Sequence, residues 1–259
     1  MTENPEFGAM LTWLLNHREL GVEALADRAG LPADEIRAVL AGDTPSEGLL
    51  RRLAPAVGFH ALDLFILAGL AVPDDMAPVD ATAERSVRDF VMDAVHLPVA
   101  GRQELLQLIR SLPQEERSSR FAPKWSEYLA DGPGGWMVSM LHYRNLSWSG
   151  MAHILGVVTP TYLSTVTYRV IGEGYKDLTP RLVTDFAALL GIDARELAAL
   201  TGVTLPEVPR PPTPEAVDAA ALVWEARRLS AAQAHHVSQL ASSMRGNSRN
   251  EYCINLPGS

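Results

Sequence analysis

The sequence predicts an all-α fold built from two similar halves, and three observations favour it. Alanine and leucine are abundant among the 259 residues, whereas alternating runs of β-branched residues are scarce. Apolar residues recur at helical spacing, as they do along the predicted first helix, residues 7–17. A pattern of about 50 residues in the first half also returns in the second half.

Composition indicates a soluble globular chain that is long enough for two domains, with 47% apolar and 20% charged residues. The start of the sequence lacks the basic and apolar regions of a signal peptide. The longest apolar run, Leu64–Val72, contains a glycine and is too short to span a membrane. A single cysteine, Cys253, allows no internal disulfide and no cysteine-based zinc site. We therefore expect a cytoplasmic protein without a membrane partner.

Two short amphipathic segments, Val22–Ala29 and Ala33–Ala41, are joined by Gly30-Leu31-Pro32. The glycine permits the positive φ of a tight turn, and the proline suits the start of the next helix. A fourth helix is expected to begin at Thr44-Pro45-Ser46 and to end at Gly58. A fifth is expected over Ala61–Ala68.

The residues from Leu20 to Gly69 contain, in order, LA-x-x-AGL, a helix that ends in AG, LLRRLAPAVGF and ALDLFILAG. This ordered set resembles the helix-turn-helix of the phage-repressor-like (XRE/Cro) family. The resemblance implies a lambda-repressor-like DNA-binding domain whose third helix is the recognition helix. Family members often carry a glutamine near the start of the helix before the turn. Here Val22 and Trp148 stand at those positions.

The second half repeats this pattern. Residues 140–157 align without a gap with residues 14–31 at an offset of 126, and 191–197 align with 58–64 at an offset of 133. The second copy therefore carries seven extra residues, which we place within Val170–Leu178. A helical hairpin, with helices expected at 83–96 and 99–112, also recurs. The predicted parts are a first helix-turn-helix domain (1–79), a helical hairpin (80–122), a second helix-turn-helix domain (123–206), a second hairpin (207–246) and a C-terminal tail (247–259).

The resemblance and the repeat together imply a sequence-specific DNA-binding transcriptional regulator with two pseudo-symmetric helix-turn-helix units in one chain. Its expected partner is double-stranded DNA. Whether the chain also forms a homodimer stays open, and so does a small-molecule effector, which no residue supports. The alternative is a protein-interaction scaffold whose degenerate helix-turn-helix domains no longer bind DNA. The net charge of −9 favours this alternative, because phosphate contacts dominate affinity for DNA.

The two predicted recognition helices differ in chemistry. In the first, the predicted DNA contacts are the outward residues Ala33, Asp34 and Arg37, although the early carboxylates suit the helix dipole better than a phosphate. The second is expected to begin at Thr159-Pro160 and to read bases more strongly, through its hydroxyl and methyl groups. The predicted DNA contacts of the second copy are Thr159, Thr161, Tyr162, Ser164, Thr165, Tyr168, Arg169, Arg144 and Lys176.

Other chemistry has little support in the residues. The seven histidines show no metal-ligand spacing, and no nucleophile–base arrangement is evident. The glycines at 132–135 and 172–174 lack the strand-then-helix context of a phosphate loop. We expect no enzyme activity, cofactor or metal. An aromatic group is predicted to form an interface between the halves, with a ligand pocket as the alternative: Trp125, Tyr128, Trp136, Tyr143 and Trp148.

Overall fold

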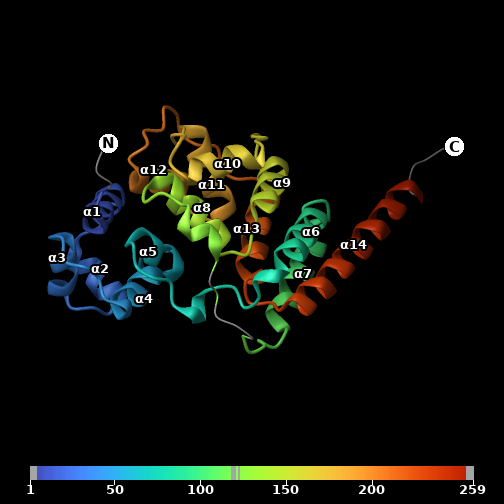
Figure 1. The fold of residues 1–259 in the computed structure, drawn as a ribbon, viewed down its shortest axis with the longest axis horizontal. Helices are drawn as coiled ribbons and strands as arrows, with labels where there is room; N and C mark the ends of the chain where they lie inside the picture. The colour runs from blue at the N-terminus through green and yellow to red at the C-terminus, as the bar shows by residue number, and fades with distance from the viewer. Residues whose placement is uncertain (1–4, 118–120, 122, 255–259) are drawn as a thin grey trace.

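A computed structural model describes residues 5–117, 121 and 123–254, and each regular element in these residues is a helix (Figure 1). Fourteen α-helices, α1 to α14, and three short 3₁₀ helices, η1 to η3, make up this part of the chain. The all-α prediction is confirmed. Among the described residues, every helix is too short or too polar to cross a bilayer.

The first, second, third and fifth helices lie within one residue of their predicted bounds, and the fourth, expected between Thr44-Pro45-Ser46 and Gly58, spans Glu47–Ala56. Gly30 ends the second helix with φ 61°, and Ser46 Oγ accepts a hydrogen bond from the backbone N–H of Leu49 at the start of the fourth. We call these five helices the first unit. They are α1 (Phe7–His17), α2 (Val22–Ala29), α3 (Ala33–Leu40), α4 (Glu47–Ala56) and α5 (Ala61–Leu67).

The order of helices then repeats, with two helices after each set of five. The connection contains η1 (Asp74–Met76) and η2 (Ala81–Ala83), and it leads to α6 (Glu84–Ala94) and α7 (Val99–Ser111). After η3 (Lys124–Glu127) comes the second unit, which consists of α8 (Pro133–His142), α9 (Trp148–Val158), α10 (Thr165–Gly172), α11 (Pro180–Leu190) and α12 (Ala194–Thr201). The last two helices are α13 (Pro214–Ala226) and α14 (Ala231–Ile254).

The last helix corrects one predicted boundary. α14 continues without a break from Ala231 to Ile254, so the predicted tail, residues 247–259, begins inside a helix. Residues 255–259 lie outside the described residues. In Figure 1 α14 leads away from the rest of the molecule toward the C-terminus.

The position of the extra residues in the second copy is also a correction. α10 begins 17 residues after α9 begins, whereas α3 begins 11 residues after α2. α11 begins 15 residues after α10, against 14 for α4 after α3. Six of the seven extra residues therefore precede α10, and their predicted place within Val170–Leu178 is wrong.

The physical reason lies at the end of α9. α2 stops at Gly30, but α9 runs past the corresponding Gly156 to Val158. The ring of Tyr162 lies on Gly156 so closely that a Cβ there would be 2.7 Å from Tyr162 Cδ2. Pro160 then keeps Thr159 extended, at φ −127° and ψ 162°, because a residue before proline avoids the helical region.

The same pairs of helices pack together inside each unit. In the first unit α3 packs on α1 and α2, while α4 packs on α2 and α5. In the second unit α10 packs on α8 and α9, while α11 packs on α9 and α12. The repeated order therefore corresponds to a repeated arrangement in space.

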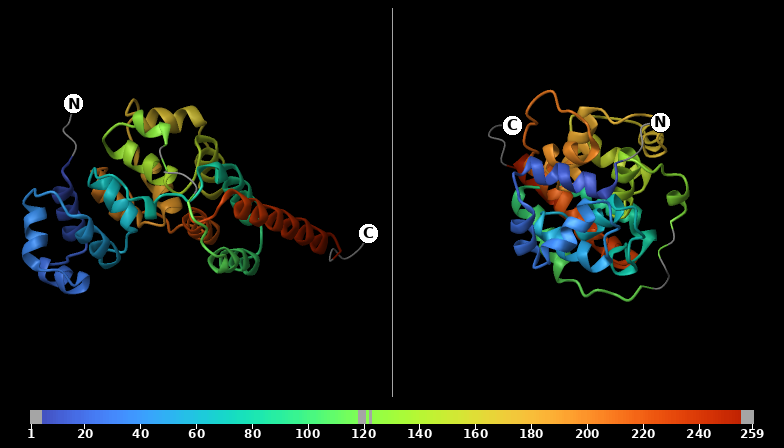
Figure 2. Two further views of the ribbon diagram at one scale, coloured as in Figure 1. Left: turned by 60° about the horizontal axis from the view of Figure 1, so that its bottom comes forward. Right: turned by 90° about the vertical axis from the view of Figure 1, so that its left-hand side faces the viewer.

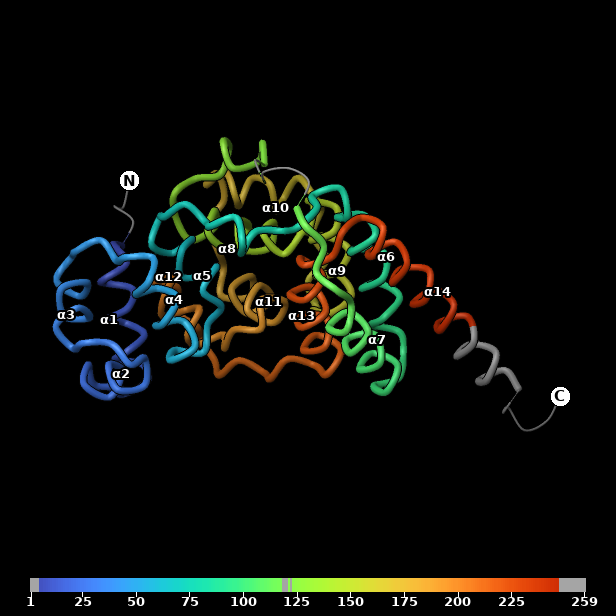
Figure 3. The backbone as a smooth tube through the Cα atoms, turned by 90° about the horizontal axis from the view of Figure 1, so that it is seen from below, coloured from blue at the N-terminus to red at the C-terminus, as the bar shows by residue number. Residues whose placement is uncertain are grey.

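The two halves contact each other reciprocally, as the subunits of a two-fold dimer do. α1 packs on α12, and the corresponding pair, α5 and α8, packs in the same way. Likewise α6 packs on α14 and α7 packs on α13, so that Figure 3 shows these four helices gathered together. The predicted hairpin helices exist, but α6 packs far more on α14 than on its neighbour α7. One cluster of buried apolar side chains extends through both halves, although the first unit lies at one end of the molecule (Figure 2).

Two corresponding ion pairs join the units. Arg18, which follows α1, binds Glu196 on α12 with Nε 2.6 Å from the carboxylate. Arg144, which follows α8, binds Asp63 on α5 through two hydrogen bonds of 2.7 and 2.8 Å. The arginines are 126 positions apart and the carboxylates 133, the two offsets of the sequence repeat.

The arginines also contact corresponding backbone carbonyls. Arg18 donates to the carbonyl of Val57 at 2.7 Å, and Arg144 donates to that of Leu190 at 3.4 Å. Each guanidinium thus links the end of the fourth helix of its own unit to the fifth helix of the other. The environments differ, because the side chains of Arg144 and Asp63 are both 0% exposed whereas those of Arg18 and Glu196 are 22% and 17% exposed.

This difference in burial predicts different costs for the same substitution. Arg144→Met leaves the carboxylate of Asp63 buried and unpaired, so we expect the free energy of unfolding to fall by about 3–5 kcal/mol. Arg18→Met, the matched change at the partly exposed pair, should cost less, on the order of 1 kcal/mol. Urea unfolding followed by circular dichroism measures both values.

The double variant Arg144→Met with Asp63→Leu removes both charges and should recover much of the loss. Equal costs for the two single variants would contradict this account of the junction.

Candidate nucleic-acid interface

α3 and α10 occupy corresponding places in the two units, and their buried residues match at an offset of 132. Ile36 and Val39 of α3 correspond to Tyr168 and Ile171 of α10, and all four are buried. The opposite side of each helix faces solvent. These two solvent-facing sides are the candidate interface.

The first turns of the two helices have different charge. On α3, Asp34 and Glu35 are exposed, and their carboxylates would repel a phosphate while stabilising the positive helix N-terminus. On α10 the corresponding residues are Val166 and Thr167, which carry no charge. Ser164 caps α10 by accepting a hydrogen bond from the backbone N–H of Thr167.

The predicted start of the second recognition helix is wrong by six residues, because the helix begins at Thr165 and not at Thr159. Thr159 Oγ1 donates to the carbonyl of Leu155 at 2.7 Å, which ties it to the end of α9. Thr161 is buried, and its Oγ1 accepts a hydrogen bond of 2.6 Å from Arg181 Nε. Tyr162 is 79% exposed in the connection. The signal missed in the sequence is Ser164, a second capping residue after Thr159, which is followed at helical spacing by Tyr168 and Ile171.

Two further predicted contacts are wrong because their side chains are buried. Arg144 is occupied by Asp63 inside the junction between the units, so it does not face a DNA surface. Tyr168 is 1% exposed and packs against Phe186, with ring centroids 6.0 Å apart. Burial, together with the nearby Asp185, raises the pKa of Tyr168 to about 12.

The remaining predicted basic contacts are exposed. Arg169 Nε lies 2.7 Å from Glu173 Oε1, one turn along α10. Lys176 follows α10 and has no ion pair with any described residue. Arg37, which corresponds to Arg169, binds Asp34 at 2.6 Å and also binds Glu23, and Ala33 is half-buried at the start of α3.

The buried junction behind these surfaces contains further charged and aromatic groups. His60 stacks on Trp224 with ring centroids 3.4 Å apart, and the guanidinium of Arg227 lies 3.8 Å from the same indole. The pKa of His60 is lowered to about 4, mainly by burial. The negative charge of Asp63 opposes this shift, and the positive charges of Arg144 and Arg227 contribute to it.

A buried histidine lies in the aromatic group of the second half. His142 stacks on Trp125 and meets Trp148 edge-on, each at a centroid distance of 4.5 Å. Its Nδ1 lies 2.8 Å from the carbonyl of Leu146, which makes Nδ1 the protonated nitrogen, while Nε2 has no partner among the described residues. Burial lowers the pKa of His142 to about 4.

These ring contacts join η3 to α8 and α9, whereas the aromatic residues were predicted to join the two halves. Of the predicted five, Tyr128 is 62% exposed, and Trp136 bonds to Asp131 through its indole N–H at 3.1 Å. The described residues contain no group of three or more His, Cys, Asp or Glu side chains that could hold a metal ion.

Comparison of the chain with protein-family models, with curated proteins and with solved structures finds no match. The interpretation of the interface therefore depends on the geometry and charges described above.

The lowered pKa values of the half-buried His60 and the buried His142 predict a loss of stability in mild acid. Both have a pKa of about 4 in the folded chain against 6.5 in an unfolded one, so the folded state binds fewer protons between these values. Above pH 6.5 both histidines are neutral in the folded and the unfolded chain, so neither lowers the free energy of unfolding. As the pH falls from 6.5 toward 4, the free energy of unfolding falls, by up to about 3 kcal/mol for His142. Urea unfolding at a series of pH values measures this slope.

Replacing His142 by asparagine should flatten the slope, because asparagine does not titrate. His153→Asn is the matched control, since His153 is exposed on α9, and it should leave the slope unchanged. A slope that is insensitive to both changes would show that other groups control the acid response.

Proposed function

We propose that the chain is a DNA-binding transcriptional regulator of the helix-turn-helix type, similar to the phage-repressor-like family, in which α10 makes most of the base contacts. The observation that carries this proposal is the uncharged, hydroxyl-bearing first turn of α10. Ser164, Thr165 and Thr167 offer donors and acceptors for base edges and phosphates there. α3 offers two carboxylates at the corresponding turn, which supports a weak role for the first unit.

Phosphate contacts come from the basic residues beside α10 in this proposal. Lys176 is exposed and free of an ion pair among the described residues. Arg169 is bound to Glu173, whose side chain is 14% exposed, but that of Arg169 is 58% exposed, so the pair is open to water on the arginine side and contributes on the order of 1 kcal/mol. A DNA phosphate can therefore replace Glu173 as the partner of Arg169 at little cost.

The arrangement of the units supports an asymmetric target. Figures 1 and 3 show α3 at one end of the molecule and α10 along a different side. A regulator of this shape contacts one half-site of the DNA through α10, while the first unit mainly supports the second unit. The reciprocal contacts of α1 with α12 and of α5 with α8 supply that support.

A second candidate function is the protein-interaction scaffold, and one observation favours it. Three apolar side chains at or beside the exposed side of α10 are solvent-accessible, namely Val157 at 43%, Tyr162 at 79% and Val166 at 65%. Exposed apolar residues that gather on one surface are typical of protein-binding sites. The net charge of −9 also weakens non-specific attraction to DNA.

Selection from random-sequence DNA followed by salt titration distinguishes the two functions. A regulator should enrich a defined sequence and bind it less tightly as the salt concentration rises. Arg169→Ala and Lys176→Ala should each weaken binding. Each should also reduce the slope of log affinity against log salt concentration by about one, the loss of one phosphate contact. Thr165→Ala should lower the preference for the selected sequence over scrambled DNA.

Arg37→Ala is the matched control for Arg169→Ala, because the two arginines occupy corresponding positions, and it should leave affinity almost unchanged. An equal loss with Arg37→Ala would assign the contact to α3 instead. Failure to enrich any sequence would contradict the regulator and favour the scaffold.

A further inference from the structure

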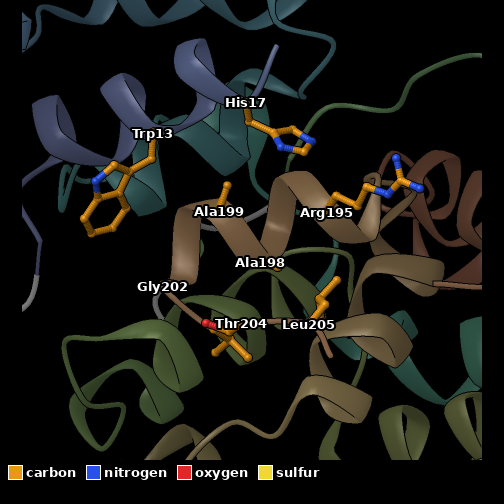
Figure 4. A pocket seen from close by; sticks show the side chains of 9 residues that line it. Trp13, His17, Arg195, Ala198, Ala199, Gly202, Thr204 and Leu205 are labelled. Carbon is orange, nitrogen blue, oxygen red and sulfur yellow. The ribbon is translucent and has the colours of Figure 1, made fainter. Parts of the chain in front are cut away.

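A hollow of about 360 Å³ lies at the contact between α1 of the first unit and α12 of the second. In Figure 4 α1, which carries Trp13 and His17, lies opposite α12 and the segment that follows it. The lining side chains therefore come from both halves of the chain. They include Trp13 and His17 of α1 and Arg195, Ala198 and Ala199 of α12.

The corresponding contact, between α5 and α8, is filled by larger side chains. Phe65 and Ile66 stand where α12 has Ala198 and Ala199, and they are only 2% and 8% exposed. Replacing a large apolar residue by alanine leaves space when the neighbours do not collapse into it. The two alanines of the second unit therefore leave room that bulky side chains occupy at the corresponding positions of the first unit.

The chemistry of the lining differs from that of the filled contact in a second way. Arg195 stands where α5 has the buried Leu62, and it is exposed without an ion pair to any described residue. His17 adds an imidazole at the same side. None of the described Asp or Glu residues lines the hollow. The neighbouring Glu196 is bound to Arg18. An anion placed here meets a cation without a competing carboxylate.

The opposite side of the hollow suits a flat apolar group. Trp13 is 39% exposed, although α1 is otherwise a helix with a buried apolar side. Its indole and the methyl groups of Ala198 and Ala199 form an apolar surface of the kind that packs against an aromatic ring. A volume of about 360 Å³ falls within the range of small-molecule sites, which begins at roughly 300 Å³.

We propose that this hollow binds a small aromatic carboxylate, with the ring between Trp13 and the two alanines and the carboxylate on Arg195 and His17. Such a ligand contacts α1 and α12 together, so it binds only when the two units are docked. It therefore stabilises the docked arrangement by mass action. This inference does not depend on DNA binding, and its test contains no nucleic acid.

The test is isothermal titration of the full chain with 2-naphthoate and, as an uncharged counterpart of the same shape, 2-naphthamide. We expect 2-naphthoate to bind with a dissociation constant on the order of 1 mM or below, as suits a ligand of this size. The amide should bind about tenfold more weakly, because it lacks the charge-assisted contact with Arg195. The thermal unfolding midpoint should rise with 2-naphthoate concentration.

Two kinds of variant assign the binding to this hollow. Arg195→Ala, a change at an exposed side chain, should weaken 2-naphthoate binding about tenfold and leave the amide unaffected. The double variant Ala198→Phe with Ala199→Ile copies the filled contact and should abolish binding of both compounds. Arg28→Ala removes an exposed arginine of α2 outside the hollow, and it should change neither affinity.

The proposal is overturned if 2-naphthoate does not bind at millimolar concentration, or if acid and amide bind equally. It is also overturned if Arg195→Ala binds 2-naphthoate as the unmodified chain does. Because Arg195 is exposed, that variant remains informative even where the filled variant fails to fold.

Discussion

The rest of the structure depends on the buried ion pair between Arg144 and Asp63. Two charges removed from water are tolerated only when each meets its partner with good geometry. Here two short hydrogen bonds join them, and a further bond runs from Arg144 to the carbonyl of Met140. Because Arg144 belongs to the second unit and Asp63 to the first, this requirement determines how the units dock.

The same junction exists twice, and the two copies differ in what they leave accessible. Around Arg144 the ion pair is fully buried, and Phe65 and Ile66 of α5 are buried as well. Around Arg18 the ion pair reaches solvent, and alanines leave a hollow at the corresponding place. A repeated fold thus provides one contact that stabilises the molecule and one with room for a ligand. The first turns of α3 and α10 also differ, because that of α3 is acidic and that of α10 is uncharged.

The parts of the candidate site that depend on local chemistry were largely predictable. Gly30 and Ser46 mark helix ends through positive φ and a capping hydroxyl, and the helices of the first unit lie where those signals place them. The start of α10 was not predictable in the same way, because Thr159-Pro160 and Ser164 are both acceptable capping signals. Only the burial of Tyr168 against the core selects the second.

The helical class, the helix bounds of the first unit and the repeated order of helices follow from the amino-acid sequence alone. Those features depend on capping, turn residues and apolar spacing within a few positions of each residue. The tertiary structure alone decided that α6 pairs with α14, that Arg144 is buried and that the hollow lies beside Trp13. Each of these depends on residues that are distant along the chain, such as Asp63 and Arg144, 81 positions apart. An arginine near a helix end looks the same in the sequence whether solvent or a second unit covers it.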